Sequence, residues 1–245
     1  MEEKKSLMNI DLNSFSTGLP NLDRTLQGLV AGDNVVWQVD SVDDYIPLVL
    51  PFWEEARRQD RKLVYFRFAR HRELLRAPRG GAVYRLRPED GFERFLGEIL
   101  DTIEKEGVGA CYVFDWLSDL AADWYSDHML GNFFRIACPY LYDLKTIAYF
   151  ALRKNHHSFE ATEAINRTAQ VILEVYRRRE RLYLHPLKVY QRYSPTLYML
   201  HNWDGDEFRP VTNSAEITEI LAKVPQPWMD FSIHRPGVWL RTFRQ

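Results

Sequence analysis

An apolar run over residues 34–39 ends in a loop rich in carboxylates, where the chain could bind a ligand. The polar residues and the tyrosine that follow this run are Asp40, Ser41, Asp43, Asp44 and Tyr45. Strand, short loop and helix in this order are typical of a phosphate-binding loop, which needs glycines and a lysine. This loop has neither, and no ammonium group is visible to offset its charge. Each like charge would cost roughly 1 kcal/mol beside a triphosphate in water, so we expect no ATP binding here.

The same carboxylates could bind a divalent cation, with Asp115 lying across the pocket from them. However, aspartate is common at helix N-caps, and Asp43 or Asp44 precedes a predicted helix. Asp115 ends a predicted strand and could cap the next helix in the same way. We therefore predict helix caps at these positions and no metal site.

A basic cluster follows the second apolar run, at residues 62–68. It consists of Arg67, Arg70, His71 and Arg72. The carboxyl end of a strand is where open α/β sheets bind ligands, so the cluster could hold an anion such as a phosphorylated metabolite. The alternative is pairing with the carboxylates of the loop, which should lie on the same edge of the sheet. We favour this internal pairing.

Other residues that could do chemistry give weaker indications. Ser118 follows the apolar run 110–114, but no histidine–acid arrangement can be assigned to it from the sequence, so hydrolase chemistry is not indicated. For His156 and His157 we expect a loop or capping role and no zinc site. We assign no catalytic residue and no cofactor. The sequence thus favours a protein that is not an enzyme.

Composition limits the possible partners. The chain has 245 residues and a net charge of −2, which does not favour nucleic-acid binding. Its two cysteines suggest free buried thiols in a reducing compartment, and no signal peptide or membrane span is visible. We expect a cytoplasmic protein. The aromatic tract 116–142 indicates core packing, or alternatively a surface for an oligomer or a partner.

Alternating strands and helices predict an α/β domain with a mostly parallel sheet between two helical layers. We predict strands near 34–39, 62–68, 82–86, 110–115 and 146–152. The apolar spacing then predicts a long helix from Ser158 to about Tyr176, which would end in the basic run Arg177–Arg181. An antiparallel meander follows from about 183 to 211, with a tight turn at Asp204-Gly205. The predicted organisation is an N-terminal arm (1–15), one domain (16–223) and an extended tail (224–245).

Several motifs resemble the KaiC branch of RecA-like ATPases. Ser16-Thr17-Gly18-Leu19-Pro20-Asn21-Leu22-Asp23 is similar to the opening of that family, and Gly32-Asp33-Asn34 is similar to the turn before its first core strand. Tyr112-Val113-Phe114-Asp115-Trp116-Leu117-Ser118 resembles its Walker B strand, and Gln191-Arg192-Tyr193-Ser194 falls at its arginine-glycine-serine element. The resemblance implies a RecA/KaiC-like three-layer sandwich and raises the expectation of self-association.

A closer likeness is to a degenerate KaiC-like module of proteins related to phosphoenolpyruvate synthase and pyruvate phosphate dikinase. Stretches 32–40, 65–71, 127–134 and 193–196 carry it. Active members of the KaiC branch place catalytic glutamates after the second strand, where this chain has Ala69-Arg70-His71. The resemblance therefore implies a regulatory or scaffolding module without ATP hydrolysis. Its expected partners are copies of itself or such a phosphotransfer enzyme. The alternatives are a sensor or enzyme that binds nucleotide or phosphometabolite through the basic cluster and, more weakly, nucleic-acid binding.

Overall fold

The structure is a computed structural model that describes residues 14–75, 81–124, 126–205, 207–222, 232–235 and 238–241. The chain divides into two compact units, residues 1–210 and 211–245. Most of the predicted arm (1–15) lies outside the described residues. In the second unit, helix α7 (Ser214–Ala222) is followed by β12 (Ser232–Arg235) and β13 (Val238–Arg241), which pair antiparallel. Most of the remaining predicted tail lies outside the description.

The first unit is built on a sheet of nine described strands, in the order β11-β10-β9-β8-β3-β7-β6-β4-β5. Six of them run parallel, as the alternation of strands and helices predicts. Their bounds are β3 (Asn34–Val39), β4 (Leu63–Arg67), β5 (Ala82–Arg85), β6 (Cys111–Trp116), β7 (Ile147–Arg153) and β8 (Val171–Arg178). The predicted meander is present as β9 (Arg181–Val189), β10 (His201–Asp204) and β11 (Glu207–Pro210), all antiparallel.

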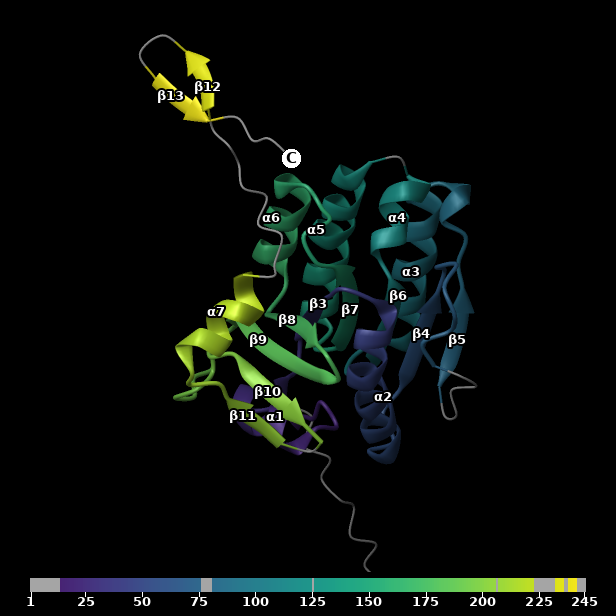
Figure 1. Cartoon of the computed structure of the whole chain (residues 1–245). Coiled ribbons are helices and arrows are strands. Elements are labelled where there is room, and N and C mark those ends of the chain that lie inside the picture. Colours follow the sequence, from purple (N-terminus) through teal and green to yellow (C-terminus); the bar gives the residue numbers. More distant parts are fainter. Residues whose placement is uncertain are drawn as a thin grey trace, which may run out of the picture. The chain divides into compact units, whose positions relative to one another are not determined.

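The helices between the parallel strands bury apolar stripes. They are α2 (Val42–Arg58), α3 (Phe92–Glu106), α4 (Ser118–Asp123), α5 (Asp127–Asp143) and α6 (Phe159–Thr168), with a 3₁₀ turn at Pro88–Asp90. Helix α5 contacts α3, α4 and α6, whereas α2 contacts β3, β4 and β6. Figure 1 shows α2 apart from the group formed by α3, α4, α5 and α6. Parallel connections are right-handed, so a connection that runs toward β5 lies on the opposite face from one that runs toward β8. Helix α2 therefore covers one face of the sheet, and α3, α4, α5 and α6 cover the other.

A small N-terminal element precedes β3. It comprises β1 (Ser14–Phe15), α1 (Pro20–Leu26) and β2 (Leu29–Val30), and β1 pairs antiparallel with β2. Gly18 has φ +78°, and a Cβ there would lie 2.1 Å from the carbonyl oxygen of Pro51. Only glycine can therefore bring this turn so close to α2.

One predicted element is wrong. Helix α6 ends at Thr168, and the stretch that we assigned to its second half is the central strand β8. The run Arg177–Arg181 consequently belongs to the β8–β9 hairpin and is not a helix terminus. The error has a physical cause. Ile165, Ala169, Ile172 and Val175 fit a helical period, and no glycine or proline marks the change of structure after residue 168.

The core takes up most of the aromatic tract 116–142. Phe133 and Phe134 of α5 are fully buried and contact Phe150 of β7. Ile136 and Tyr142 of the same helix are each 44% exposed. The two cysteines are free and buried, as predicted, and burial raises the pKa of each thiol to about 12.

Candidate functional site

Several charged side chains of the first unit lie at the carboxyl ends of the parallel strands. At the end of β3, Asp40 pairs with Lys154 at 3.2 Å. Asp43 pairs with Arg72, and Asp44 pairs with Arg177. Each of these loop carboxylates therefore has a cationic partner from another part of the sheet edge.

The predicted caps at this loop are wrong. Helix α2 begins at Val42 with Ser41 as its N-cap residue, so Asp43 and Asp44 lie inside its first turn. The Asp44 carboxylate instead accepts a hydrogen bond from the Ser41 hydroxyl at 2.9 Å. A carboxylate in the first turn still interacts favourably with the positive end of the helix dipole.

The expectation that no ammonium group offsets the charge of the loop is wrong too, because Lys154 pairs with Asp40. The Lys154 side chain is only 3% exposed. The ammonium donates to the Val175 carbonyl at 2.7 Å and lies 3.8 Å from the centre of the Tyr176 ring. Residue 154 follows β7, and β7 pairs with β3 so that Val39 faces Arg153. Strand pairing thus brings the missing ammonium group beside Asp40.

A second group of charges surrounds Asp115, and we call Asp115, Tyr65, Arg67 and His71 the Asp115 cluster. The Asp115 side chain is fully buried and pairs with the Arg67 guanidinium. Its Oδ1 atom accepts from the Tyr65 hydroxyl at 3.0 Å and lies 3.0 Å from His71 Nε2. Its Oδ2 atom accepts from the backbone N–H groups of residues 68 and 69, at 3.1 and 2.9 Å.

Electrostatics inside the Asp115 cluster favour the charged forms. Burial alone would raise the pKa of Asp115, but His71 and Arg67 together bring this pKa below its usual value. Burial opposes the charge on His71, yet the contact with Asp115 outweighs it and raises the pKa of the imidazole. The cap predicted for Asp115 is wrong, because its carboxylate binds groups of β4 and of the chain just after it.

The remaining predicted site residues are dispersed. Arg70 pairs with Asp123 at 3.2 Å, and its side chain is 88% exposed. Tyr45 is fully buried, and its hydroxyl has no partner among the described residues. Arg72 pairs with the loop, whereas Arg67 pairs with Asp115. The basic cluster is thus divided between three carboxylates, and this division does not favour binding of an anion by its arginines acting together.

A third group was not predicted from the sequence. The Ser118 hydroxyl lies 2.7 Å from His157 Nε2, and His157 Nδ1 lies 2.6 Å from an Asp127 carboxylate oxygen. We call these three residues the relay. Ser118 begins α4 directly after β6, Asp127 begins α5, and His157 lies in the loop between β7 and α6.

Hydrogen bonds to the backbone fix both ends of the relay. Ser118 Oγ accepts from the Arg153 N–H at 2.7 Å, and Asp127 accepts from the N–H of Ser158. Burial lowers the pKa of His157 more than Asp127 raises it, so the imidazole is neutral at pH 7. For Asp127, burial is opposed by the hydrogen bonds from Ser158 and His157, and its pKa is lowered.

A small hollow, partly open to solvent, adjoins the relay at His157, whereas Ser118 and Asp127 lie behind its wall. Its wall contains His157 together with Gln38, Leu152, Arg153, Asn155, His156, Thr162 and Ile165. The hollow lies at the carboxyl ends of β3 and β7, the edge at which α/β sheets bind ligands. Among the described residues we find no side chain that pairs with the exposed Arg153.

Only part of this edge could be recognised from the sequence. The sequence indicated Ser118 and His157 separately, but Asp127 carries no local motif that links it to them. Ser158 does cap α6, as predicted, since its hydroxyl accepts from the Ala161 N–H. In the part of the chain that the structure describes, no cluster of three or more His, Cys, Asp or Glu side chains could hold a metal ion.

No known protein-family model matches this sequence, and no curated protein matches it. None of the helices that the structure describes is long and apolar enough to cross a bilayer.

Proposed function

We propose that this chain is a RecA/KaiC-like module that does not hydrolyse ATP and acts as a regulatory or scaffolding unit. Its partners would be copies of itself or a phosphotransfer enzyme of the phosphoenolpyruvate synthase type. The observation that carries the proposal is the pairing of Asp40, Asp43 and Asp44 with Lys154, Arg72 and Arg177. Lys154, the buried ammonium at this edge, is held by Asp40 and by a backbone carbonyl, so it is not free to bind phosphate.

The motifs that resemble the family hold the backbone together. Asp23 accepts hydrogen bonds from Ser16 and from the Thr17 N–H, which closes the opening turn. Asp33 pairs with Arg192 at 2.8 Å, and both side chains are buried. The family features that are missing are those that would handle phosphate. The structural motifs are thus present and the phosphate-binding ones are missing, which supports a role of the fold as a scaffold.

The Walker B-like aspartate also supports the proposal. Both oxygens of Asp115 are occupied by protein donors, two of which are backbone N–H groups that cannot turn away. A carboxylate held in this way would have to lose an ion pair with Arg67 before it could bind magnesium, and breaking a buried ion pair is costly.

Exposed tyrosines support the binding of a protein partner. Tyr190, Tyr193 and Tyr198 follow β9 and are 48%, 72% and 53% exposed. The Tyr198 hydroxyl donates to the Val189 carbonyl at 3.4 Å, so the turn folds back on the end of the strand. Tyrosine is enriched in the cores of protein interfaces, where its ring supplies contact area.

Thermal unfolding with and without Mg·ATP, Mg·ADP, phosphoenolpyruvate or pyruvate tests the proposal. A ligand at 100 times its dissociation constant adds about 2.7 kcal/mol of stability, which raises the midpoint by several degrees. We expect no shift with either nucleotide. Light scattering should show self-association that Tyr193→Ser weakens, or else the phosphotransfer enzyme should bind the chain in a pull-down. A clear shift with Mg·ATP, or a monomer without affinity for that enzyme, would contradict the proposal.

A further inference from the structure

We propose that Ser118, His157 and Asp127 form a nucleophile, a general base and an orienting acid that react with small acyl compounds entering the adjacent hollow. The evidence is geometric. The hydroxyl–imidazole distance of 2.7 Å and the imidazole–carboxylate distance of 2.6 Å both lie within hydrogen-bond reach. A hydroxyl, an imidazole and a carboxylate in this order activate serine in hydrolases on unrelated folds.

Protonation states fit this assignment. A general base must be neutral at the working pH, and burial keeps the His157 imidazole neutral at pH 7. The charged Asp127 accepts the proton on Nδ1, which leaves the lone pair of Nε2 directed at the Ser118 hydroxyl. His157 therefore has the tautomer that proton transfer from Ser118 requires.

The local fold places Ser118 at a sharp strand-to-helix junction. Strand β6 ends at Trp116 and α4 begins at Ser118, so a single residue separates them. The Arg153 N–H occupies one acceptor position of Oγ, and the hydroxyl proton points to His157. A serine hydroxyl has a second lone pair, and this remains for attack on an electrophile.

The reaction that we propose is ester hydrolysis in two steps. Ser118 Oγ bonds to the carbonyl carbon as its proton moves to His157 Nε2, and the alcohol leaves with that proton when its C–O bond breaks. A water then gives a proton to His157 while its oxygen bonds to the acyl carbon, and Ser118 departs with the proton. The products are one acid and one alcohol, and no oxidant or reductant is needed.

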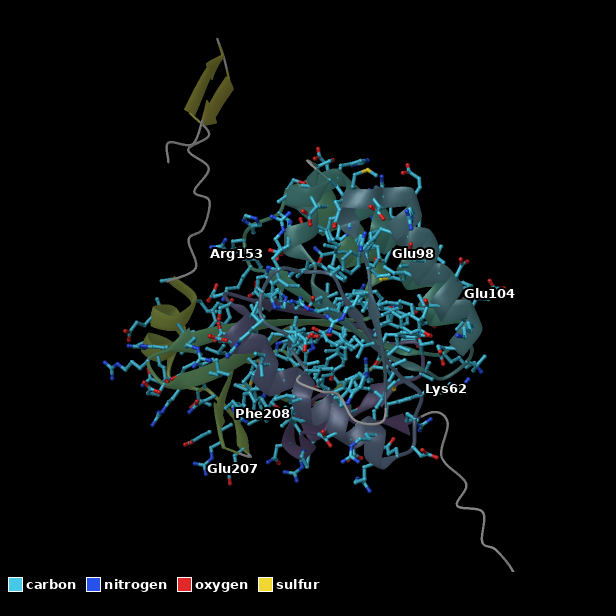
Figure 2. All side chains as sticks on the ribbon, turned by 90° about the vertical axis from the view of Figure 1, so that its right-hand side faces the viewer. Lys62, Glu98, Glu104, Arg153, Glu207 and Phe208 are labelled. Carbon is cyan, nitrogen blue, oxygen red and sulfur yellow. The ribbon has the colours of Figure 1, made fainter. Side chains whose placement is uncertain are left out.

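The hollow suggests which esters would enter. It is small and partly open to solvent, so any acyl group that enters it must be small. Arg153 lies at the periphery of the first unit (Figure 2), and its guanidinium belongs to the wall of the hollow. Among the described residues, we find no side chain that pairs with it. Arg153 and the Asn155 amide can donate to a carboxylate, so we infer a preference for small esters that carry an anionic group.

The competing explanation is a purely structural connection between α4, α5 and the loop before α6. Ser118 is only 5% exposed, which would also suit that role. The two explanations differ in one observable property. A structural serine is no more reactive than other serines, whereas a serine beside a positioned base attacks electrophiles that other hydroxyls ignore.

A fluorophosphonate probe provides the test on the full-length chain. Attack by Ser118 forms an O–P bond, expels fluoride and passes the hydroxyl proton to His157. We expect one adduct per chain by intact mass, located on Ser118 by peptide mapping. Ser118→Ala should abolish labelling, and Ser194→Ala should not. Ser194 loses a comparable hydrogen bond (2.8 Å to the Thr25 carbonyl), but among the described residues it contacts no histidine.

Mapping on the unaltered protein decides the question even if Ser118→Ala does not fold. Absence of an adduct, or an adduct on a serine other than Ser118, would overturn the proposal. The substrate class is tested separately by comparing hydrolysis of p-nitrophenyl acetate with that of the mono-p-nitrophenyl ester of succinate. We expect faster turnover of the anionic ester and loss of this preference in Arg153→Gln. Equal rates for both esters in the unaltered protein would overturn the anionic preference.

Discussion

The Asp115 cluster and the relay contain the same kinds of group in a different order. In the Asp115 cluster the carboxylate is central, and both the Tyr65 hydroxyl and His71 contact the same Oδ1 atom. In the relay the imidazole is central, with the hydroxyl on one nitrogen and the carboxylate on the other. A central carboxylate gathers donors and holds them in place, whereas a central imidazole can accept a proton on one side while the other side is held.

Burial acts differently in the two regions. The Asp115 cluster includes the Arg67 guanidinium, whose charge helps keep Asp115 ionised although the carboxylate is fully buried. The relay contains no arginine, and its histidine is neutral. The first arrangement is suited to stability and the second to chemistry. Matched substitutions in the two regions test this contrast.

The largest difference should appear when each histidine is replaced by glutamine. Loss of a general base typically costs a factor of about 10²–10⁴ in rate. His157→Gln should therefore slow fluorophosphonate labelling by this factor, whereas His71→Gln should leave the labelling rate unchanged. Time courses of adduct formation by intact mass measure both variants. If labelling slowed equally in both variants, His157 would have no special role as a base.

Replacement of each aspartate by asparagine should have a smaller effect, on stability, and the Asp115 cluster should lose more of it than the relay. Asp115→Asn leaves the largely buried side chains of Arg67 and His71 without a counter-charge, and we expect a loss of about 3–5 kcal/mol in the free energy of unfolding. For Asp127, whose side chain is 27% exposed, we expect about 1.5 kcal/mol from one weakened hydrogen bond to a charged group. Urea denaturation of both variants measures the difference. A loss at Asp127 as large as that at Asp115 would show that the relay is mainly structural.

The smallest expected effect is a pair of pH dependences with opposite signs. The pKa of His71 is raised, so its stabilising contribution is complete below about pH 6.5 and is lost as the pH rises through the folded-state value. The pKa of His157 is lowered, so its contribution is present above about pH 6.5 and is lost as the pH falls through the folded-state value.

Urea denaturation between pH 5 and pH 9 can separate these contributions. His71→Gln should flatten the decline in stability on the alkaline side, and His157→Gln should flatten it on the acid side. One proton changes the free energy of unfolding by at most about 1.4 kcal/mol per pH unit, so the slopes are small but measurable. A change on the same side in both variants would contradict the assigned protonation states.

The sheet could be predicted from the sequence because its strands are buried on both faces. Runs such as Asn34–Val39 and Cys111–Trp116 are mostly apolar and almost completely buried, and helices of clear amphipathic period separate them. Strand β8 was missed because Ile172 and Val175 continue the spacing of α6 across a boundary without a breaking residue. Periodicity alone cannot assign such a segment.

The charged edge could not be predicted, since its contacts depend on strand order. Asp40 meets Lys154 because β7 lies next to β3, although 114 residues separate them in the sequence. Ser118 and His157 meet because β6 and β7 are also neighbours. No local motif states which strands will be adjacent, so the sequence could give the residues of the site but not their pairing.

The two cysteines give this protein a built-in reporter of opening. Cys111 lies in β6 and Cys138 in α5, both are fully buried, and a pKa of about 12 leaves almost no thiolate at neutral pH. An alkylating reagent can therefore reach them only when the strand or the helix separates from its neighbours. The rate of their modification measures how often the interior of the domain is exposed to solvent, without any added label.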